Sequence, residues 1–245
     1  MTEFIKKPNL PERKVKKIIC GTDDSKILKF FEKEEIDVIS IAPNINVDNA
    51  VSRHADMFAL HLGENRVIID KAQKELYNTL ISLGMDVLVT EKEIYGIYPG
   101  DVGLNFALFG DFAVGNFKFA DKVLPENINS AEMINVRQGY AKCSILIVNK
   151  NTIITDDESI HRKVVEKGIN SLLISKGDVF LEGHEYGFIG GASGKLSDDT
   201  VVFFGNIEFH RDYKLIKAFL EKNNCKFVCT DDGKLRDIGG FISLI

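Results

Sequence analysis

Charged and amide residues stand directly before several short apolar runs of this sequence, and they are the first candidates for binding chemistry. Three of them are the aspartates Asp56, Asp101 and Asp237. Carboxylates that face one concavity can bind a cation, and convergent polar groups at a concavity are typical of a ligand site. The alternative is that these groups pair with one another as structural salt bridges. The residues that we predict from the sequence to bind a ligand are Arg53, His54, Asp56, Asp101, Asn105, Arg137, Gln138, Cys143, His184, Arg236 and Asp237.

Cys143 and His54 are the residues that we predict to be catalytic if the protein is an enzyme. A thiolate is a strong nucleophile, and the neighbouring Lys142 would lower the pKa of the Cys143 thiol. A small buried core residue is the commoner role for a Cys at the start of a strand, and the sequence leaves both interpretations open. Cys225 and Cys229 lack the spacing and the His pair of a zinc site, so we predict no metal.

A glycine-rich run, Gly187-Phe188-Ile189-Gly190-Gly191-Ala192-Ser193-Gly194-Lys195, invites comparison with phosphate-binding loops. A P-loop needs Ser or Thr directly after the Lys, where this chain has Leu196, and a dinucleotide loop must open a helix. We therefore predict no cofactor. Close approach of backbones explains the glycines better, and N–H groups presented to an anion are the alternative.

The elements that would position these residues form a repeated unit of strand, strand, helix and strand. In residues 141–175, Ile145–Val148 turns tightly into Thr152–Thr155, which predicts a β-hairpin. Thr155 or Asp156 can cap a helix that buries Ile160, Val164 and Val165 and ends at Gly168. A third strand then completes the unit.

Three further copies follow the same order over residues 57–90, 100–136 and 196–230. In the first of them, Met57–Leu62 and Arg66–Ile69 predict the hairpin, and Asp70 can cap the helix. In the second, Pro125 shortens the helix. The third strands recur regularly, since Asp37 to Asp86 and Asp86 to Asn135 both span 49 residues.

A fifth copy exists only if the two ends of the chain are joined. Residues 15–41 supply a strand, a helix and a strand, and residues 240–245 supply the missing first strand. An unpaired apolar strand invites aggregation, and pairing it with residues 15–20 would close a ring. We therefore predict one α/β domain over residues 1–245, a five-bladed α/β propeller whose blade starts line a central pore. An open sheet of strand-helix-strand units is the alternative, which the short hairpin turns disfavour.

A ring of five such units resembles the pentein fold of the guanidino-group-modifying enzymes: arginine deiminase, dimethylarginine hydrolase, agmatine deiminase and amidinotransferase. Ala55-Asp56-Met57-Phe58-Ala59-Leu60 is similar to the acidic blade start that holds the guanidinium in dimethylarginine hydrolases. Gly177-Asp178-Val179-Phe180-Leu181 is similar to their Gly-Asp-Val-Leu-Phe blade start, and Gly239-Gly240 to the run before their nucleophile. The resemblance implies that Asp56 pairs with a cationic ligand and that Asp178, a further predicted ligand-binding residue, lies near the centre.

The chain departs from this family at the positions that carry its chemistry. The resemblance implies a catalytic Cys near the chain's end, where this sequence has Gly240 or Phe241. It also implies a His at the start of the preceding blade, where this sequence has Phe188-Ile189-Gly190-Gly191. We therefore expect a divergent branch of the family that lacks the catalytic Cys and His.

Bulk properties exclude several classes of function. A net charge of −5 without a basic stripe argues against nucleic acid as a partner. No apolar run approaches the ~18 residues of a membrane helix, and residues 1–11 lack the apolar core of a signal peptide. Four cysteines in 245 residues do not form a disulfide framework. We expect a cytoplasmic protein, and the oligomeric state stays open.

Three functions remain, from different classes. The first is a non-catalytic or chemically divergent protein that binds a small ligand in the central pore, either a cationic guanidino compound or an amino-acid-like one. The second is a module that binds a protein or ribosomal partner through the propeller face, as the anti-association translation factor of this fold does. The third is a hydrolase or amidinotransferase on arginine-like substrates, with catalytic groups relocated to Cys143 and His54.

Overall fold

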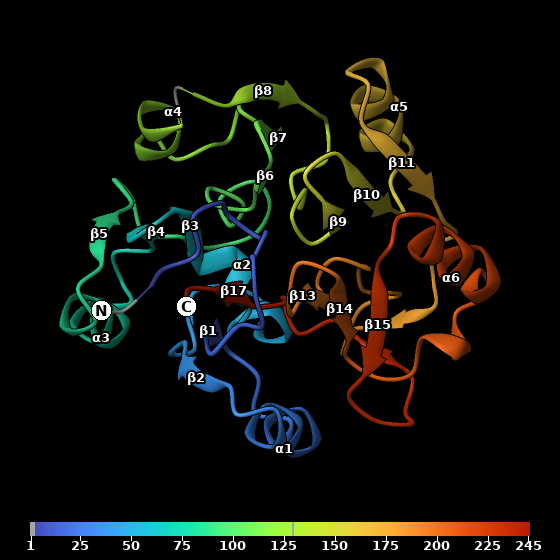
Figure 1. Cartoon of the computed structure of the whole chain (residues 1–245). Coiled ribbons are helices and arrows are strands. Elements are labelled where there is room, and N and C mark those ends of the chain that lie inside the picture. The colour runs from blue at the N-terminus through green and yellow to red at the C-terminus, as the bar shows by residue number, and fades with distance from the viewer. Residues whose placement is uncertain (1–2, 129) are drawn as a thin grey trace.

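The computed structural model describes residues 3–128 and 130–245, and its α/β fold consists of several small sheets (Figure 1). Met1, Thr2 and Asn129 of the predicted domain lie outside the described residues. Five of the sheets have three strands, in which the first strand pairs antiparallel with the second, and the second parallel with the third. Four of these sheets thus follow the predicted order of strand, strand, helix and strand, and the fifth combines strands from both ends of the chain.

The unit in residues 141–175 has the predicted hairpin and helix, with one difference at the cap. It consists of β9 (Ile145–Asn149), β10 (Thr152–Thr155), α5 (Glu158–Glu166) and β11 (Asn170–Leu173). Asp157, rather than Thr155 or Asp156, caps the helix, and its carboxylate accepts from the N–H groups of Ser159 at 2.8 Å and Ile160 at 2.9 Å. Thr155 is still paired in β10, so the helix begins later than predicted.

The apolar face of α5 is narrower than its sequence suggests. Ile160 and Val164 are buried, whereas Val165 is 48% exposed. Burying each such aliphatic side chain contributes about 1.5–3 kcal/mol. The helix ends as predicted, since Gly168 has a φ of +76°, a conformation that suits Gly after a helix.

Three other sheets repeat this order. Their elements are β3 (Ala59–Gly63), β4 (Arg66–Ile69), α3 (Lys74–Ser82) and β5 (Asp86–Val89); β6 (Ala107–Phe109), β7 (Phe112–Gly115), α4 (Val123–Asn127) and β8 (Glu132–Asn135); and β13 (Ser193–Lys195), β14 (Thr200–Phe203), α6 (Tyr213–Lys222) and β15 (Lys226–Cys229). The 3₁₀ helices η1 (Asn49–Val51) and η2 (Ile207–Phe209) lie in the connections.

Two predicted boundaries in these copies are wrong. Met57 belongs to a short helix, α2 (Ala55–Phe58), instead of the first strand of its hairpin. The N-cap of α3 is Gln73, because Asp70 is used earlier, where its carboxylate accepts from the N–H groups of Ala72 and Ile94.

The two ends of the chain meet in the fifth three-stranded sheet. β17 (Ile242–Ser243) pairs antiparallel with β1 (Lys17–Cys20), so that Ile18 faces Ser243 and Ile19 faces Ile242. β1 continues through α1 (Ser25–Lys33) into β2 (Asp37–Ser40), to which it pairs in parallel. The pairing of head and tail that the sequence predicts is confirmed.

The helices lie at the periphery, while α2 and β17 lie near the middle of the molecule (Figure 1). A sixth sheet, β12 (Val179–Phe180) with β16 (Leu235–Arg236), was not predicted because each strand has only two residues. Among the described residues, no helix is long and apolar enough to cross a membrane.

Candidate functional site

One cavity of about 410 Å³ collects residues from the starts of all five three-stranded sheets. His54 precedes β3, Asp101 precedes β6, Cys143 precedes β9, Phe188 precedes β13 and Asp237 precedes β17, and all five line the cavity. Its volume lies within the ~300–1,000 Å³ of small-molecule sites. Residues that are far apart in sequence therefore form one concavity of ligand size.

The carboxylate of Asp237 is held in this cavity by the backbone. Its Oδ2 accepts from the Phe188 N–H at 2.9 Å and its Oδ1 from the Gly239 N–H at 3.0 Å. A Cβ on Gly191 would lie 1.9 Å from Oδ1. The glycine-rich run therefore permits the close approach that the sequence analysis favours, and it leads into strand β13 and not into a helix.

Asp101 and three rings form a second part of the wall. The Tyr140 hydroxyl donates to Asp101 Oδ2 at 2.7 Å, whereas the buried Oδ1 has no hydrogen-bond partner. Burial raises the pKa of Asp101, although the Tyr140 bond acts against this. The Tyr140 ring stacks on the Phe188 ring, with ring centroids 6.1 Å apart. The ring centroids of Tyr98 and Tyr140 are 5.9 Å apart.

Asp56, a predicted ligand-binding residue, is only 1% exposed and is not among the residues that line the cavity. Neither of its carboxylate oxygens has a hydrogen-bond partner of normal geometry. Burial raises the pKa of Asp56 to about 6, while His54 and Lys142 favour its charged form. A buried carboxylate is costly to the fold, and one with a raised pKa is typical of a functional site.

The pKa of the Cys143 thiol is raised, so the predicted lowering by Lys142 is wrong. Burial, together with the negative charges of Asp56 and Asp237, raises the pKa of Cys143 well above its ordinary value. Asn105 fixes the residue, because its Nδ2 donates to Sγ at 3.0 Å and its Oδ1 accepts from the N–H groups of Lys142 and Cys143. The ammonium group of Lys142 lies in a different cavity from the thiol.

His54 faces the same cavity, with its Nδ1 3.7 Å from Asp237 Oδ1 and without a hydrogen-bond partner. Gly239, at φ +73°, packs on it, and a Cβ there would lie 2.3 Å from the His54 Cβ. His184 lies on the rim, where its Nε2 is 3.6 Å from Asp48 Oδ1. The cavity thus lies between several of the predicted polar groups.

The other predicted residues lie outside this cavity. Arg53 and Arg236 line a neighbouring pocket of about 320 Å³, where Arg236 pairs with Asp231 and Asp24. Arg137 is exposed, and Gln138 donates to Asp157 at 3.2 Å.

Asp178 is not a central residue, contrary to the expectation from the family resemblance. It forms a two-pronged ion pair with Arg211, at 2.7 and 2.9 Å. This pair lowers the pKa of Asp178 to about 2.

The aromatic walls of the cavity were not predicted from the sequence. Tyr98, Tyr186 and Phe188 all line it. Each stands next to a Gly or a Pro in a connection between sheets, as in Tyr186-Gly187-Phe188. An aromatic residue beside a turn former is a weak signal, because it is equally typical of ordinary loops.

No metal centre accompanies these groups. Across residues 3–128 and 130–245, no three or more His, Cys, Asp and Glu side chains are grouped so as to hold a metal ion. All four cysteines are free thiols.

Solved structures of guanidino-modifying enzymes share the fold of this chain. The inosamine-phosphate amidinotransferase of Streptomyces griseus is 11% identical, with a TM-score of 0.59 over 96% of this chain and 93% of that one. A C. jejuni agmatine deiminase is 13% identical, with a TM-score of 0.56 over 95% and 94%. DDAH from Pseudomonas aeruginosa, a mutant complexed with citrulline, is 10% identical, with a TM-score of 0.59 over 95% and 100%. At these identities the likeness establishes the α/β pentein fold alone.

Sequence comparison gives a family of its own. None of the curated proteins matches this chain in sequence. The model of DUF6873, a family of unknown function, matches residues 18–242, which is most of the chain. The chain therefore belongs to the DUF6873 family and has the fold of the penteins.

Proposed function

We propose that the five three-stranded sheets are the blades of a single-domain pentein propeller, and that the cavity of about 410 Å³ binds a small guanidino or amidine cation. One observation carries this proposal. The described residues that line the cavity include four carboxylates and neither Lys nor Arg; the carboxylates are Asp48, Asp101, Glu185 and Asp237. Such a lining favours a cation and disfavours an anion.

The geometry of the wall suits a flat cation with several N–H donors. Asp101 offers its unpartnered Oδ1, and Asp237 keeps free lone pairs on both oxygens beside its two backbone bonds. A guanidinium group forms paired hydrogen bonds with carboxylates. The faces of Tyr98 and Tyr140 add cation–π attraction, which contributes about 0.5–2 kcal/mol. The neighbours of similar fold include an agmatine deiminase and a DDAH complexed with citrulline, which are proteins of this ligand class.

We favour a protein that binds its ligand without the thiolate chemistry that the family resemblance implies. The segment before β17 carries Gly240 and Phe241, where the resemblance implies a nucleophile. Cys143 is in the cavity, but its neighbours Asp56 and Asp237 oppose the thiolate. A reactive cysteine needs the opposite surroundings, with positive charge nearby.

A ligand-binding titration tests the proposal. The wild-type protein is titrated with agmatine, arginine and methylguanidine by calorimetry, and thermal unfolding is followed in parallel. A ligand at 100 times its dissociation constant adds about 2.7 kcal/mol to the free energy of unfolding. Asp101→Asn should abolish this gain, whereas Asp232→Asn, which changes an exposed aspartate outside the cavity, should retain it. Absence of binding by all three compounds would overturn the proposal.

A second candidate function is hydrolysis or amidine transfer by relocated groups. It rests on one observation, namely that Cys143 and His54 line the same cavity. Incubation with agmatine or arginine, followed by assays for ammonia, urea and transferred amidine, distinguishes the two functions. Turnover that disappears in Cys143→Ala would establish the enzyme, and binding without turnover would establish the binding protein.

A further inference from the structure

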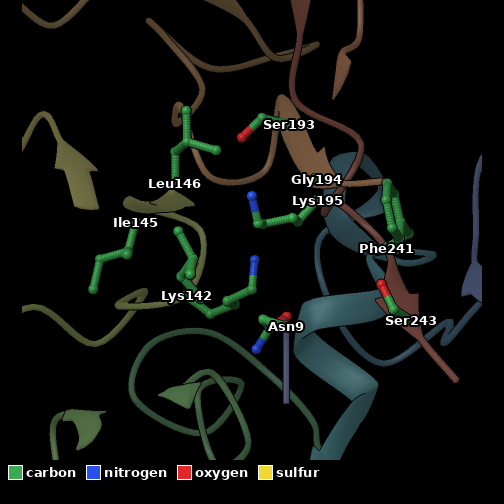
Figure 2. Close-up of a pocket in the computed structure, with 10 residues that line it drawn as sticks. Asn9, Lys142, Ile145, Leu146, Ser193, Gly194, Lys195, Phe241 and Ser243 are labelled. Atoms are coloured by element: carbon green, nitrogen blue, oxygen red, sulfur yellow. The ribbon is translucent and has the colours of Figure 1, made fainter. Parts of the chain in front are cut away.

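A second and much smaller chamber, of about 10 Å³, collects buried cationic groups (Figure 2). Lys142 and Lys195 enter it from different sheets, and they are only 6% and 5% exposed. Figure 2 shows the two ammonium nitrogens directed into the same space. Asn9, Ser193 and Ser243 supply the polar part of the remaining wall.

The charge of these two lysines is not balanced inside the chamber. No Asp or Glu is among the described residues that line it, and neither lysine forms an ion pair with a described residue. Lys195 Nζ contacts the Cys225 thiol, at 3.9 Å. Cys225 is itself kept neutral, because burial raises the pKa of its thiol.

The acidic residues that act on the lysines do not line the chamber and form no ion pair with them. Asp198 and Asp199 act on Lys195 electrostatically, and the Asp199 carboxylate bonds to Lys226 at 2.8 Å. Asp56 acts on Lys142 in the same way. Burying two ammonium groups side by side without an ion-paired carboxylate is unfavourable. An anion between them would relieve this cost.

The donors and the size of the chamber define the anion. The ammonium groups of Lys142 and Lys195 and the hydroxyl of Ser243 can donate to it. Ser193 already donates to the Ile189 carbonyl at 2.7 Å, and the amide of Asn9 to the Leu108 carbonyl at 2.9 Å. A volume of about 10 Å³ corresponds to roughly one small site, which favours a single-atom anion over phosphate and carboxylate groups with several heavy atoms.

We propose that Lys142 and Lys195 hold a single halide ion, chloride under cellular conditions, in this chamber. The site is distinct from the cavity of the proposed function, and the inference does not depend on that function. Chloride would act as a structural counter-ion that joins the turn before β9 to strand β13.

The experiment measures thermal unfolding of the full-length protein in sodium chloride, sodium bromide and sodium gluconate at equal, low ionic strength. Gluconate is too large for the chamber. We expect a saturable rise of the melting temperature in chloride and bromide, on the order of 5 °C at 100 times the dissociation constant. Lys195→Met should lose this rise, and the matched control Lys217→Met, on the exposed face of α6, should keep it. Equal melting temperatures in all three salts would overturn the proposal.

A second measurement decides the question if Lys195→Met does not fold. Crystals of the wild-type protein grown in bromide should show an anomalous peak between the two lysine nitrogens. A chamber without such a peak, occupied by water alone, would overturn the proposal irrespective of the variants.

Discussion

The two cavities are built from neighbouring residues and yet have opposite charge. In the turn before β9, Cys143 faces the larger cavity with Asp101 and Asp237, while Lys142 faces the small chamber with Lys195. The larger cavity, at about 410 Å³, is roomy enough for a ligand, whereas the chamber, at about 10 Å³, is not. Two adjacent residues of one segment therefore line cavities of opposite charge, because their side chains point in different directions.

Asp56 lines neither cavity, but it interacts electrostatically with a residue of each. The negative charge of Asp237, which lines the larger cavity, opposes the charged form of Asp56. The positive charge of Lys142, which lines the chamber, favours it. Its burial outweighs the attraction, so its pKa is raised and not lowered. The charge of Asp56 should therefore destabilise the fold, and variants of this residue can test the expectation.

The largest effect should come from removing the charge of Asp56. Its pKa rises from 3.8 in the unfolded chain to about 6 in the fold, so the folded state binds the extra proton between these values. The contribution of Asp56 to stability is therefore present at low pH and is lost as the pH rises from about 4 to 6. Asp56→Asn should remove this loss and stabilise the protein at pH 7 by at most about 3 kcal/mol. Urea unfolding between pH 4 and pH 7.5 measures it.

A second buried aspartate, which lines neither cavity although the charge of Asp237 acts on it, provides a comparison for this effect. Burial raises the pKa of Asp156 to about 7, and Asp156 lines neither cavity. Asp156→Asn should remove a similar pH dependence, but it should leave binding of agmatine unchanged. An unaltered pH dependence in Asp56→Asn would show that Asp56 does not titrate in this range.

The next effect in size separates the two cavities by their ligands. Asp101→Asn should weaken binding of agmatine by about 100-fold, because a charge-assisted hydrogen bond contributes roughly 1.5–3 kcal/mol. It should leave the halide dependence of the melting temperature intact. Lys195→Met should abolish the halide dependence of the melting temperature and leave the affinity for agmatine unchanged. Calorimetry and thermal unfolding on both variants measure the four outcomes, and loss of both responses in either variant would mean that the cavities are not independent.

A smaller effect concerns the backbone that positions Asp237. A Cβ on Gly191 would lie 1.9 Å from the Asp237 carboxylate, so Gly191→Ala must displace it. We expect a loss of about 1–3 kcal/mol in stability and a weaker affinity for agmatine. Gly84→Ala is the control, because φ there is +84° but no atom lies within 4 Å. It should cost about 1 kcal/mol of stability through backbone strain alone, with unchanged affinity.

Much of the fold was predictable because it depends on local patterns. Hairpin turns, the Gly168 helix end and the recurrence of the unit all follow from residue type and spacing, and the match of the two chain ends follows from counting units. The boundaries at Met57 and Asp70 were wrong for a physical reason. Tertiary packing recruited these residues into α2 and into a bond to Ile94, and local sequence does not encode such contacts.

The candidate site was predictable only in part. His54, Asp101 and Asp237 stand before first strands, and the fold brings them together at one cavity. Charge alone did not show that Asp178 would pair with Arg211, since that partner is 33 residues away. The orientation of Lys142 away from Cys143 was equally hidden, because two adjacent residues in a turn can face opposite sides.

The smallest expected effect is that of Cys143, and it bears on whether the larger cavity does chemistry. If the thiol serves only as a packed, protonated wall residue, Cys143→Ala should bind agmatine within about 3-fold of the wild type, which corresponds to less than 1 kcal/mol. Iodoacetamide at pH 7 should label Cys143 slowly, because its raised pKa leaves little thiolate. Mass spectrometry of labelled peptides, with and without agmatine, measures the rate. Rapid labelling that agmatine suppresses would instead place a nucleophile in the cavity, and the protein would then belong with the enzymes whose fold it shares.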